Sequence, residues 1–334
     1  MAEVPPGSAT AQRVGFVGLG NVGGKLAGSL LRNGVELVVR DLDPEAMAPF
    51  LDAGASTAAS GAELAERCDV VITCLPSPAA SAVVLEADHG VLAGFAASKA
   101  PAPKIWAEMS TTDHHEVRRL GAQVEAAGGA AIDCPVSGGC HRAATGNIAI
   151  FAGGDRSTFD AMLPLLTTMG RRILHTGPLG SASILKVVTN YLATANLVSL
   201  CEALVTSDAA GMDLATAYEA IRISSGNSFV HETESQVILN GSRDINFTMD
   251  LVCKDIGLFA DIAAEHGIPL ELSPVLVDVF ADGAARYGER EWSPNIIRRL
   301  EDATGRTITA PGFPAEIVDD EPEVPGAEVV VRGS

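Results

Sequence analysis

The stretch RVGFVGLGNVGG at residues 13–24 decides the fold of this chain. A short apolar, β-branched run leads directly into three glycines spaced Gly-x-Gly-x-x-Gly, and a helical pattern follows. In such a turn the first glycine allows the tight bend, the second lets the backbone approach a pyrophosphate, and the third lets helix and strand pack closely. The stretch therefore predicts a dinucleotide-binding turn. Its candidate cofactor-binding residues are Gly18, Leu19, Gly20, Asn21, Val22 and Gly23.

An acidic residue at the end of the next expected strand strengthens this interpretation. Asp41 closes the run ELVVRD, where a carboxylate accepts hydrogen bonds from the adenosine ribose and repels a 2′-phosphate. Arg40 is a competing signal, because a nearby arginine can hold that phosphate. Strand alternation, however, points Arg40 away from the side of Asp41. The pattern favours NAD as cofactor, with NADP the less favoured alternative.

The pattern of elements divides the chain. From Arg13 to about His175, short β-branched runs alternate with segments of helical length, which is typical of a doubly wound parallel sheet with helices on both faces. Residues 13–176 are therefore expected to form an α/β domain of the Rossmann type. Within it, Asp43-Pro44 predicts a helix start and Gly54 the end of that helix.

After Gly180 the strand pattern stops. Residues 177–302 are expected to form an all-α domain, with helices over 181–210, 213–224, 250–266 and 273–287. Residues 303–334 are rich in proline and acidic residues, which predicts a solvated C-terminal tail. The alternative is that the run EVVVR near its end adds an edge strand to a sheet.

Composition and charge exclude several classes of function. The 334 residues carry a net charge of −19 without a cluster of Lys and Arg, so nucleic acid is not an expected partner. The six cysteines form no CxxC pair and have no zinc-type spacing with histidine. We therefore expect no metal site, and we expect the cysteines to be reduced thiols. No uncharged apolar run approaches the roughly 18 residues of a membrane span, and the N-terminus has no secretory pattern. A soluble, cytoplasmic protein is expected.

One charged residue stands apart in the apolar stretch 176–201. Lys186 is the only formally charged side chain there, and Ser183, Asn190 and Thr194 share its helical face at spacings of three and four. The alternative is a lysine whose stem packs while its head reaches water. Oxidation of an alcohol by hydride transfer requires a base for the hydroxyl proton. A lysine desolvated in a mostly apolar site has its pKa lowered towards neutrality, which suits that task.

A second glycine-rich segment is IDCPVSGGCHRAATGN at residues 132–147. In it, Ser137, Gly138 and Gly139 leave a hydroxyl and backbone N–H groups unobstructed, which suits a carboxylate. An ordinary turn is the alternative. His141 and Arg142 follow directly, and the sequence leaves open whether they reach a second anionic group on a substrate.

Five motifs occur in the order and spacing of one family. They are GLGNVG at 18–23, EMST at 108–111, DCPVSGG at 133–139, GPLGSASILKVVTN at 177–190 and CKDIGLF at 253–259. From Arg13 to Asp302 the chain resembles the β-hydroxyacid dehydrogenases, the group of 3-hydroxyisobutyrate dehydrogenase and 6-phosphogluconate dehydrogenase. The resemblance implies a Rossmann-type domain, a long interdomain helix and a helical domain that helps form a homodimer or homotetramer.

The resemblance also implies roles for individual residues. Lys186 matches the catalytic lysine and Asn190 the asparagine one turn later, while Ser137, Gly138 and Gly139 match the substrate-carboxylate loop. Lys254 and Asp255 match a motif near substrate and cofactor, and the nicotinamide side is matched by Leu75, Pro76 and Thr111. The chain departs from the family at Ala182, where a glycine is usual, at Thr189, where many members have a second asparagine, and in the segment 140–142.

These observations predict an NAD-dependent oxidoreductase acting on a small hydroxy carboxylic acid of the 3-hydroxyisobutyrate type, with Lys186 as general acid and base. Serine, glycerate and tartronate semialdehyde, 4-hydroxybutyrate and sulfonated hydroxyacids are alternative substrates within the same chemistry. A non-catalytic NAD-binding scaffold is the alternative from another class, since a fold does not guarantee activity. The retained lysine disfavours an imine reductase, because those relatives commonly replace it.

Overall fold

The computed structural model describes residues 12–331, which form two compact units. Among these described residues, unit 1 comprises 12–186 together with 319–331, and unit 2 comprises Val187–Val318. The chain therefore crosses between the units twice. The first crossing lies within a helix that begins at Ser181, and the second lies beyond residue 303, in the segment expected to be a free tail.

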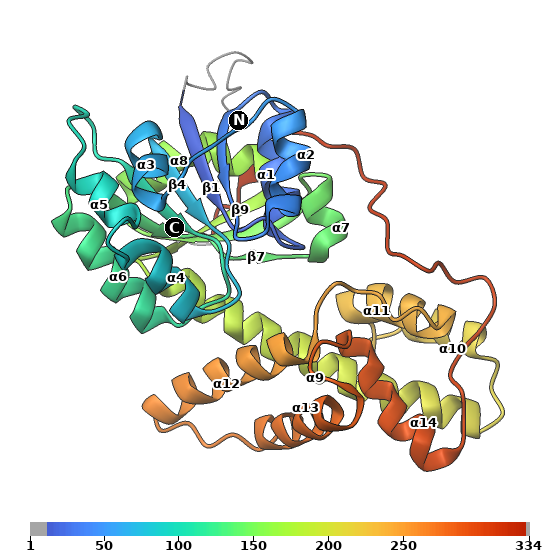
Figure 1. The fold of residues 1–334 in the computed structure, drawn as a ribbon. Helices are drawn as coiled ribbons and strands as arrows, with labels where there is room; N and C mark the ends of the chain where they lie inside the picture. Colours follow the sequence, from blue (N-terminus) through green and yellow to red (C-terminus); the bar gives the residue numbers. More distant parts are fainter. Residues whose placement is uncertain (1–11, 332–334) are drawn as a thin grey trace. The chain divides into compact units, whose positions relative to one another are not determined.

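Unit 1 is built on a single sheet flanked by helices (Figure 1). Its strands follow the order β10-β9-β8-β6-β5-β4-β1-β2-β3, with β7 paired to β8. The strands are β1 (Arg13–Val17), β2 (Glu36–Arg40), β3 (Ser56–Thr57), β4 (Val70–Thr73), β5 (Ile105–Glu108), β6 (Ala130–Asp133), β7 (Val136–Ser137), β8 (Ile148–Gly153), β9 (Gly170–Gly177) and β10 (Ala327–Glu328). The helices are α1 (Gly23–Arg32), α2 (Pro44–Asp52), α3 (Gly61–Arg67), α4 (Pro78–Glu86), α5 (Val91–Ala96), α6 (His114–Ala126), α7 (Gly139–Ala144) and α8 (Arg156–Met169).

Helices cover both faces of this sheet, as the alternation of strands and helices predicts. Along β5, Ile105 and Ala107 face a core that includes side chains of α1 and α8, whereas Trp106 faces a second core lined by α3 to α6. The local signals for α2 are confirmed: the Asp43 carboxylate accepts a hydrogen bond from the Glu45 N–H, and Gly54 follows the helix with a φ of 99°. The Rossmann-type architecture is confirmed.

The sheet departs from a fully parallel arrangement at one point. The pairs from β3 through β6 are parallel, but β8 runs antiparallel to both β6 and β7. In the connection from β6 to β8, the strand β7 pairs antiparallel with β8, and the six-residue helix α7 lies between these two strands, so the chain reverses direction here without a crossover helix. Strands β9 and β10 then continue parallel to β8.

Unit 2 is helical. With α9 (Ser181–Ala209), which begins in unit 1, its elements are α10 (Leu214–Arg222), α11 (Phe229–Asn240), α12 (Met249–Glu265), α13 (Ser273–Tyr287), the 3-10 turn η1 (Ser293–Ile297) and α14 (Arg298–Thr304). The four expected helices are present with ends shifted by at most two residues. Helix α11 was not expected; its N-cap Ser228 accepts a hydrogen bond from the His231 N–H.

The C-terminal segment does not remain a solvated tail. It returns to unit 1, where Ala327 and Glu328 form β10 parallel to β9, so the alternative of an edge strand describes this segment better. The Val329 N–H donates to the Ile173 carbonyl oxygen at 2.7 Å, and Glu328 forms a two-pronged ion pair with Arg156 at 2.7 and 3.0 Å. Proline and acidic composition predicted exposure, but backbone pairing decided the position.

Within residues 12–331, two segments are long and apolar enough to cross a membrane by length and composition alone, namely Pro78–Ala96 and Ser181–Ala209. The first consists of α4 and α5, and the second is α9. Core helices of globular proteins share this property, and Leu197, Leu200 and Leu204 of α9 lie in the core of unit 2. Packing within unit 2 thus accounts for part of the apolar character of α9, since 33% of the apolar window in this helix is buried.

Candidate functional site

The glycine-rich turn lies where the strand order reverses. From β1 the chain passes outward to β2 and β3, and then returns to β4 on the opposite side of β1. In open α/β sheets, ligands bind in the crevice beyond the carboxyl ends of the strands at such a switch point. The turn that follows Val17 occupies this position, and its Gly18 N–H donates to the Arg40 carbonyl oxygen at 3.0 Å.

The three glycines of the turn have different surroundings. Gly18 has a φ of 95°, and a Cβ there would lie 2.3 Å from the Cys74 carbonyl oxygen; a Cβ on Gly23 would lie 2.1 Å from the Gly18 carbonyl oxygen. Gly20 is open, since a Cβ there would meet no atom within 4 Å. Gly18 and Gly23 are therefore required by the close packing of the backbone around them. Gly20 instead leaves space at the start of α1 where a pyrophosphate fits.

Asp41 lies beside this turn. Its carboxylate accepts hydrogen bonds from the Leu19 N–H at 2.6 Å and the Asp43 N–H at 2.9 Å. Arg40 is directed elsewhere, because its Nη1 donates to the carbonyl oxygens of Ala58 and Ala59, both at 3.0 Å. Arg40 therefore points away from the side of Asp41, as strand alternation predicts.

The loops after β4 and β5 are tied together. The Leu75 N–H donates to the Ser110 hydroxyl at 2.7 Å, and Ser110 donates from both its N–H and its hydroxyl to the buried Glu108 carboxyl group. Burial raises the pKa of Glu108, and the hydrogen bonds from Ser110 oppose that shift. This places the loops that bear Pro76 and Thr111 at the same edge as the glycine turn.

The second glycine-rich segment forms a turn at the start of α7. Gly138 and Gly139 have φ values of 133° and 84°, which only glycine adopts without strain, and Ser137 ends β7. His141 folds back over this turn, since a Cβ on Gly139 would lie 2.8 Å from its ring. Burial and the charge of Arg142 lower the pKa of His141, which favours a neutral imidazole at pH 7.

Lys186 lies on α9 one turn after an anchor that the sequence did not reveal. The buried Asp133 carboxylate, at the end of β6, accepts hydrogen bonds from the Gly180 N–H at 2.8 Å, the Ser183 N–H at 2.7 Å and the Ser183 hydroxyl at 2.8 Å. Burial raises the pKa of Asp133, and these three bonds oppose the rise. Lys186 itself is 8% exposed. Asp133 is the first residue of the motif DCPVSGG, and in the sequence only its position at the end of an expected strand indicated that it anchors α9.

Asn190 and Lys254 are linked through one carboxylate. Asp255, which is 1% exposed, accepts a hydrogen bond from Asn190 Nδ2 at 2.5 Å through one oxygen and pairs with Lys254 Nζ at 2.6 Å through the other. The rings of Tyr191 and Phe259 stack at 4.1 Å between the same two helices. Two motifs that are 64 residues apart in the sequence, at 190 and 254, thus form one cluster in unit 2.

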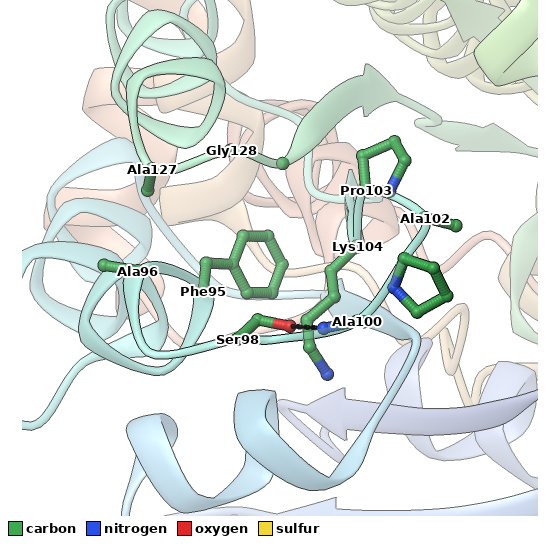
Figure 2. Close-up of a pocket in the computed structure, with 11 residues that line it drawn as sticks. Phe95, Ala96, Ser98, Ala100, Ala102, Pro103, Lys104, Ala127 and Gly128 are labelled. Atoms are coloured by element: carbon green, nitrogen blue, oxygen red, sulfur yellow. Dashed lines mark hydrogen bonds between the residues drawn. The ribbon is translucent and has the colours of Figure 1, made fainter.

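A surface cavity of about 290 Å³ lies at the opposite end of the sheet (Figure 2). It surrounds the loop before β5 and is lined mainly by alanine, proline and glycine, together with Phe95. The Lys104 ammonium group donates to the Glu66 and Cys68 carbonyl oxygens at 3.1 and 2.5 Å. Because ligands of such sheets bind at the carboxyl ends of the strands, this cavity is separate from the site described above.

Comparison with known proteins agrees with this geometry. Residues 13–177 match the NAD-binding domain of 6-phosphogluconate dehydrogenase, and residues 180–300 match the NAD-binding domain of NADP-dependent 3-hydroxyisobutyrate dehydrogenase. The chain is 30% identical to 2-(hydroxymethyl)glutarate dehydrogenase of Eubacterium barkeri, over 89% of this chain and 97% of that protein. It is 31% identical to mitochondrial 3-hydroxyisobutyrate dehydrogenase of Rattus norvegicus, over 84% of both chains.

Among solved structures, 3-hydroxyisobutyrate dehydrogenase of Mycobacterium tuberculosis with L-serine is similar, with a TM-score of 0.75 and 28% identity over 86% of this chain and 99% of that one. The fold and the glycine turn define an NAD(P)-dependent oxidoreductase of two units, one Rossmann-type and one helical. The chain belongs to the β-hydroxyacid dehydrogenase family, in the group of 3-hydroxyisobutyrate dehydrogenase.

Proposed function

We propose that this protein oxidises the hydroxyl group of a small hydroxy carboxylic acid with NAD, and that Lys186 exchanges the hydroxyl proton. The observation that carries the proposal is the burial of the Lys186 side chain, at 8% exposure, on a helix whose start is fixed by Asp133. A structural lysine would gain from reaching water, whereas a proton-transfer group gains from being held in a largely apolar surrounding.

Cofactor binding, substrate binding and proton transfer are assigned to different residues. The glycine turn and Asp41 hold the dinucleotide, which when bound accepts the hydride. Ser137, Gly138 and Gly139 hold the substrate carboxylate through backbone N–H groups and a hydroxyl. Lys186 Nζ takes the proton of the substrate hydroxyl and returns it in the reverse reaction.

Asn190 completes this set. Its side chain is fixed by a hydrogen bond to the buried Asp255, and its proposed role is to orient the substrate hydroxyl or to hold the lysine. Lys254, held by the other oxygen of Asp255, adds a positive charge that favours an anionic substrate or cofactor.

Substitution of the lysine tests the central role. Lys186→Ala is expected to lower kcat by at least about 10³-fold, in the range of lost general acid–base catalysis, with the Kd for NAD within twofold of wild type. Lys99→Ala, in an exposed loop of unit 1, is the matched control and is expected to retain full activity. Substantial kcat in Lys186→Ala would contradict the proposal. The assay is NAD reduction at 340 nm with a panel of hydroxyacids.

The preference for NAD rests on the Asp41 carboxylate beside Leu19 and on the occupied guanidinium of Arg40. We expect the KM for NADP to exceed that for NAD by at least about tenfold, the effect of roughly 1.4 kcal/mol of charge repulsion. Asp41→Ser is expected to narrow this ratio. A lower KM for NADP in the wild-type protein would overturn the assignment.

The substrate class follows from the carboxylate loop and from the named substrates of the relatives. The panel should contain 3-hydroxyisobutyrate, serine, glycerate, 4-hydroxybutyrate and a sulfonated hydroxyacid, together with a hydroxy dicarboxylate. We expect the highest kcat/KM for a hydroxyacid of the 3-hydroxyisobutyrate type. Equal rates with and without a second anionic group would exclude a role for Arg142 or His141 in recognising such a group.

We further propose a cytoplasmic homodimer or homotetramer. All six cysteines are free thiols, in keeping with a reducing compartment, and unit 2 exposes apolar side chains that suit a subunit interface, among them Leu192 and Val275. Sedimentation equilibrium measures the oligomeric state, and a monomer at micromolar concentration would contradict this assembly. Fractionation of the source cells tests the compartment.

A further inference from the structure

The C-terminal segment contacts the short helix α7 at its end. The Asp319 carboxylate accepts hydrogen bonds from the Thr145 hydroxyl and from Asn147 Nδ2, the latter at 2.8 Å. The same Asn147 amide donates to the Glu321 carbonyl oxygen at 3.0 Å, and Asn147 is only 5% exposed. These contacts lie within unit 1, to which Asp319 and the following residues belong. The C-terminal segment is therefore held on unit 1 by several hydrogen bonds, two of them from a buried side chain.

Neighbouring acidic residues extend the attachment. Glu321 approaches Arg142 of α7 at 3.7 Å, and Glu323 accepts a hydrogen bond from Asn33 at 3.0 Å at the end of α1. Arg32, which also contacts Glu323, donates to the Ala144 carbonyl oxygen at 2.8 Å and so ties α1 to the end of α7. The acidic composition of this segment thus matches basic and amide side chains on unit 1.

Helix α7 depends on such support. It contains six residues, and isolated helices shorter than about 12 residues are marginal in water. It starts at Gly139, so the residues assigned to the substrate carboxylate directly precede it or begin it. Burial raises the pKa of Asp319, but the hydrogen bonds from Thr145 and Asn147 outweigh that effect and the pKa is lowered, so the carboxylate is charged at neutral pH.

We propose that Asp319 is a positioning residue that fixes the substrate loop Ser137–Gly139 through Thr145, Asn147 and α7. The inference rests on the proposed function for the role of the loop. The residues that match the family models end at residue 300, so this support lies outside the matched domains. Asp319 sets the affinity for the hydroxyacid without touching it.

A second attachment of the segment makes a matched control available. The Gly326 N–H donates to the Thr167 carbonyl oxygen at 2.9 Å, and a Cβ at Gly326 would lie 1.9 Å from the Gly170 carbonyl oxygen, so this contact is close. Together with β10 and the ion pair of Glu328 with Arg156, it holds the segment on the sheet edge independently of Asp319. Glu328→Ala removes one acidic side chain from the same segment without altering a contact to α7.

The test compares Asp319→Ala, Asp319→Asn and Glu328→Ala in the full-length protein. Hydrogen exchange of the backbone amides of residues 138–147 is followed without substrate, and steady-state kinetics are measured with the preferred hydroxyacid. In Asp319→Ala we expect exchange of these amides to be about tenfold faster, the consequence of losing two hydrogen bonds that oppose local opening. We expect the KM for the hydroxyacid to rise about fivefold or more, with kcat and the KM for NAD within twofold.

Asp319→Asn keeps one acceptor oxygen and is expected to fall between Asp319→Ala and wild type, while Glu328→Ala is expected to match wild type in both measurements. Unchanged exchange in Asp319→Ala, faster exchange with an unchanged KM, or an equal effect of Glu328→Ala would each overturn the proposal. A wild-type protein that oxidises no hydroxyacid would refute the proposed function instead, and the exchange measurement would still decide whether Asp319 holds the loop.

Discussion

Asp133 offers the most direct test of how unit 1 holds the start of α9, the helix that bears Lys186. Its carboxylate receives three hydrogen bonds from the start of α9, at 2.7 to 2.8 Å, and is fully buried. Asp133→Asn keeps the size of the side chain, and its amide oxygen is able to keep the bond from the Gly180 N–H. Its NH2 group, however, then faces the Ser183 N–H, which loses its acceptor.

The magnitude follows from this loss. A hydrogen bond to a charged acceptor contributes about 1.5 to 3 kcal/mol, and a buried donor left without a partner costs about as much. We therefore expect Asp133→Asn to lower the free energy of unfolding by about 2 kcal/mol. Ser183→Ala, which removes only the hydroxyl bond, is expected to cost about 1 kcal/mol. Because α9 bears Lys186 one turn further on, kcat is expected to fall in Asp133→Asn as well.

Urea unfolding followed by circular dichroism at pH 8 measures these differences. Asp155→Asn is the matched control, since Asp155 is an exposed N-cap residue of α8 whose side chain makes no capping hydrogen bond, and less than about 0.5 kcal/mol is expected there. A loss below about 0.5 kcal/mol in Asp133→Asn, equal to the control, would refute the view that Asp133 anchors the helix.

Three further predictions concern other parts of the chain. Burial raises the pKa of Glu234 from 4.5 to about 8, so between these values the folded protein holds a proton that the unfolded chain has lost, and stability falls as the pH rises. Glu234→Gln is expected to flatten the dependence of unfolding free energy on pH between 5 and 8; an unaltered slope would rule this out. Gly23→Ala is expected to impair folding, because its Cβ would lie 2.1 Å from a carbonyl oxygen. Gly20→Ala, where the Cβ meets no atom, should retain the melting temperature and weaken NAD binding measured by calorimetry. Arg243→Ala should cost about 3 kcal/mol in urea unfolding, because it removes the guanidinium whose Nη2 donates to both carboxylate oxygens of the nearly buried Glu301. A loss under about 1 kcal/mol would contradict that.

The local pattern of the sequence was enough to predict much of this protein. The glycine spacing after an apolar strand, and the acidic residue closing the next strand, predict the switch point of the sheet. Gly18 and Gly23 are each required by a close backbone contact within a few residues or beside the adjacent strand, whereas Gly20 leaves the backbone open. The boundary between strand-rich and helix-rich sequence placed the two classes of structure. The polar stripe on α9 singled out Lys186, because a charge in an apolar helix is visible without any tertiary information.

Other features arise only when distant segments meet. The reversal of β8 depends on a short connection whose helix, α7, could not be distinguished from an ordinary turn. The anchoring of α9 by Asp133 joins residues about 50 positions apart, and the clamp of Asp255 on Asn190 joins residues 65 apart. The C-terminal segment carries the composition of a solvated tail, yet its carboxylates pair with guanidinium groups on α1, α7 and α8 and with amides just after α1 and α7. Periodicity and composition indicate which residues are buried and in which kind of element they lie. Which carboxylate pairs with which donor is decided only by packing in three dimensions, because the partners are distant in the sequence.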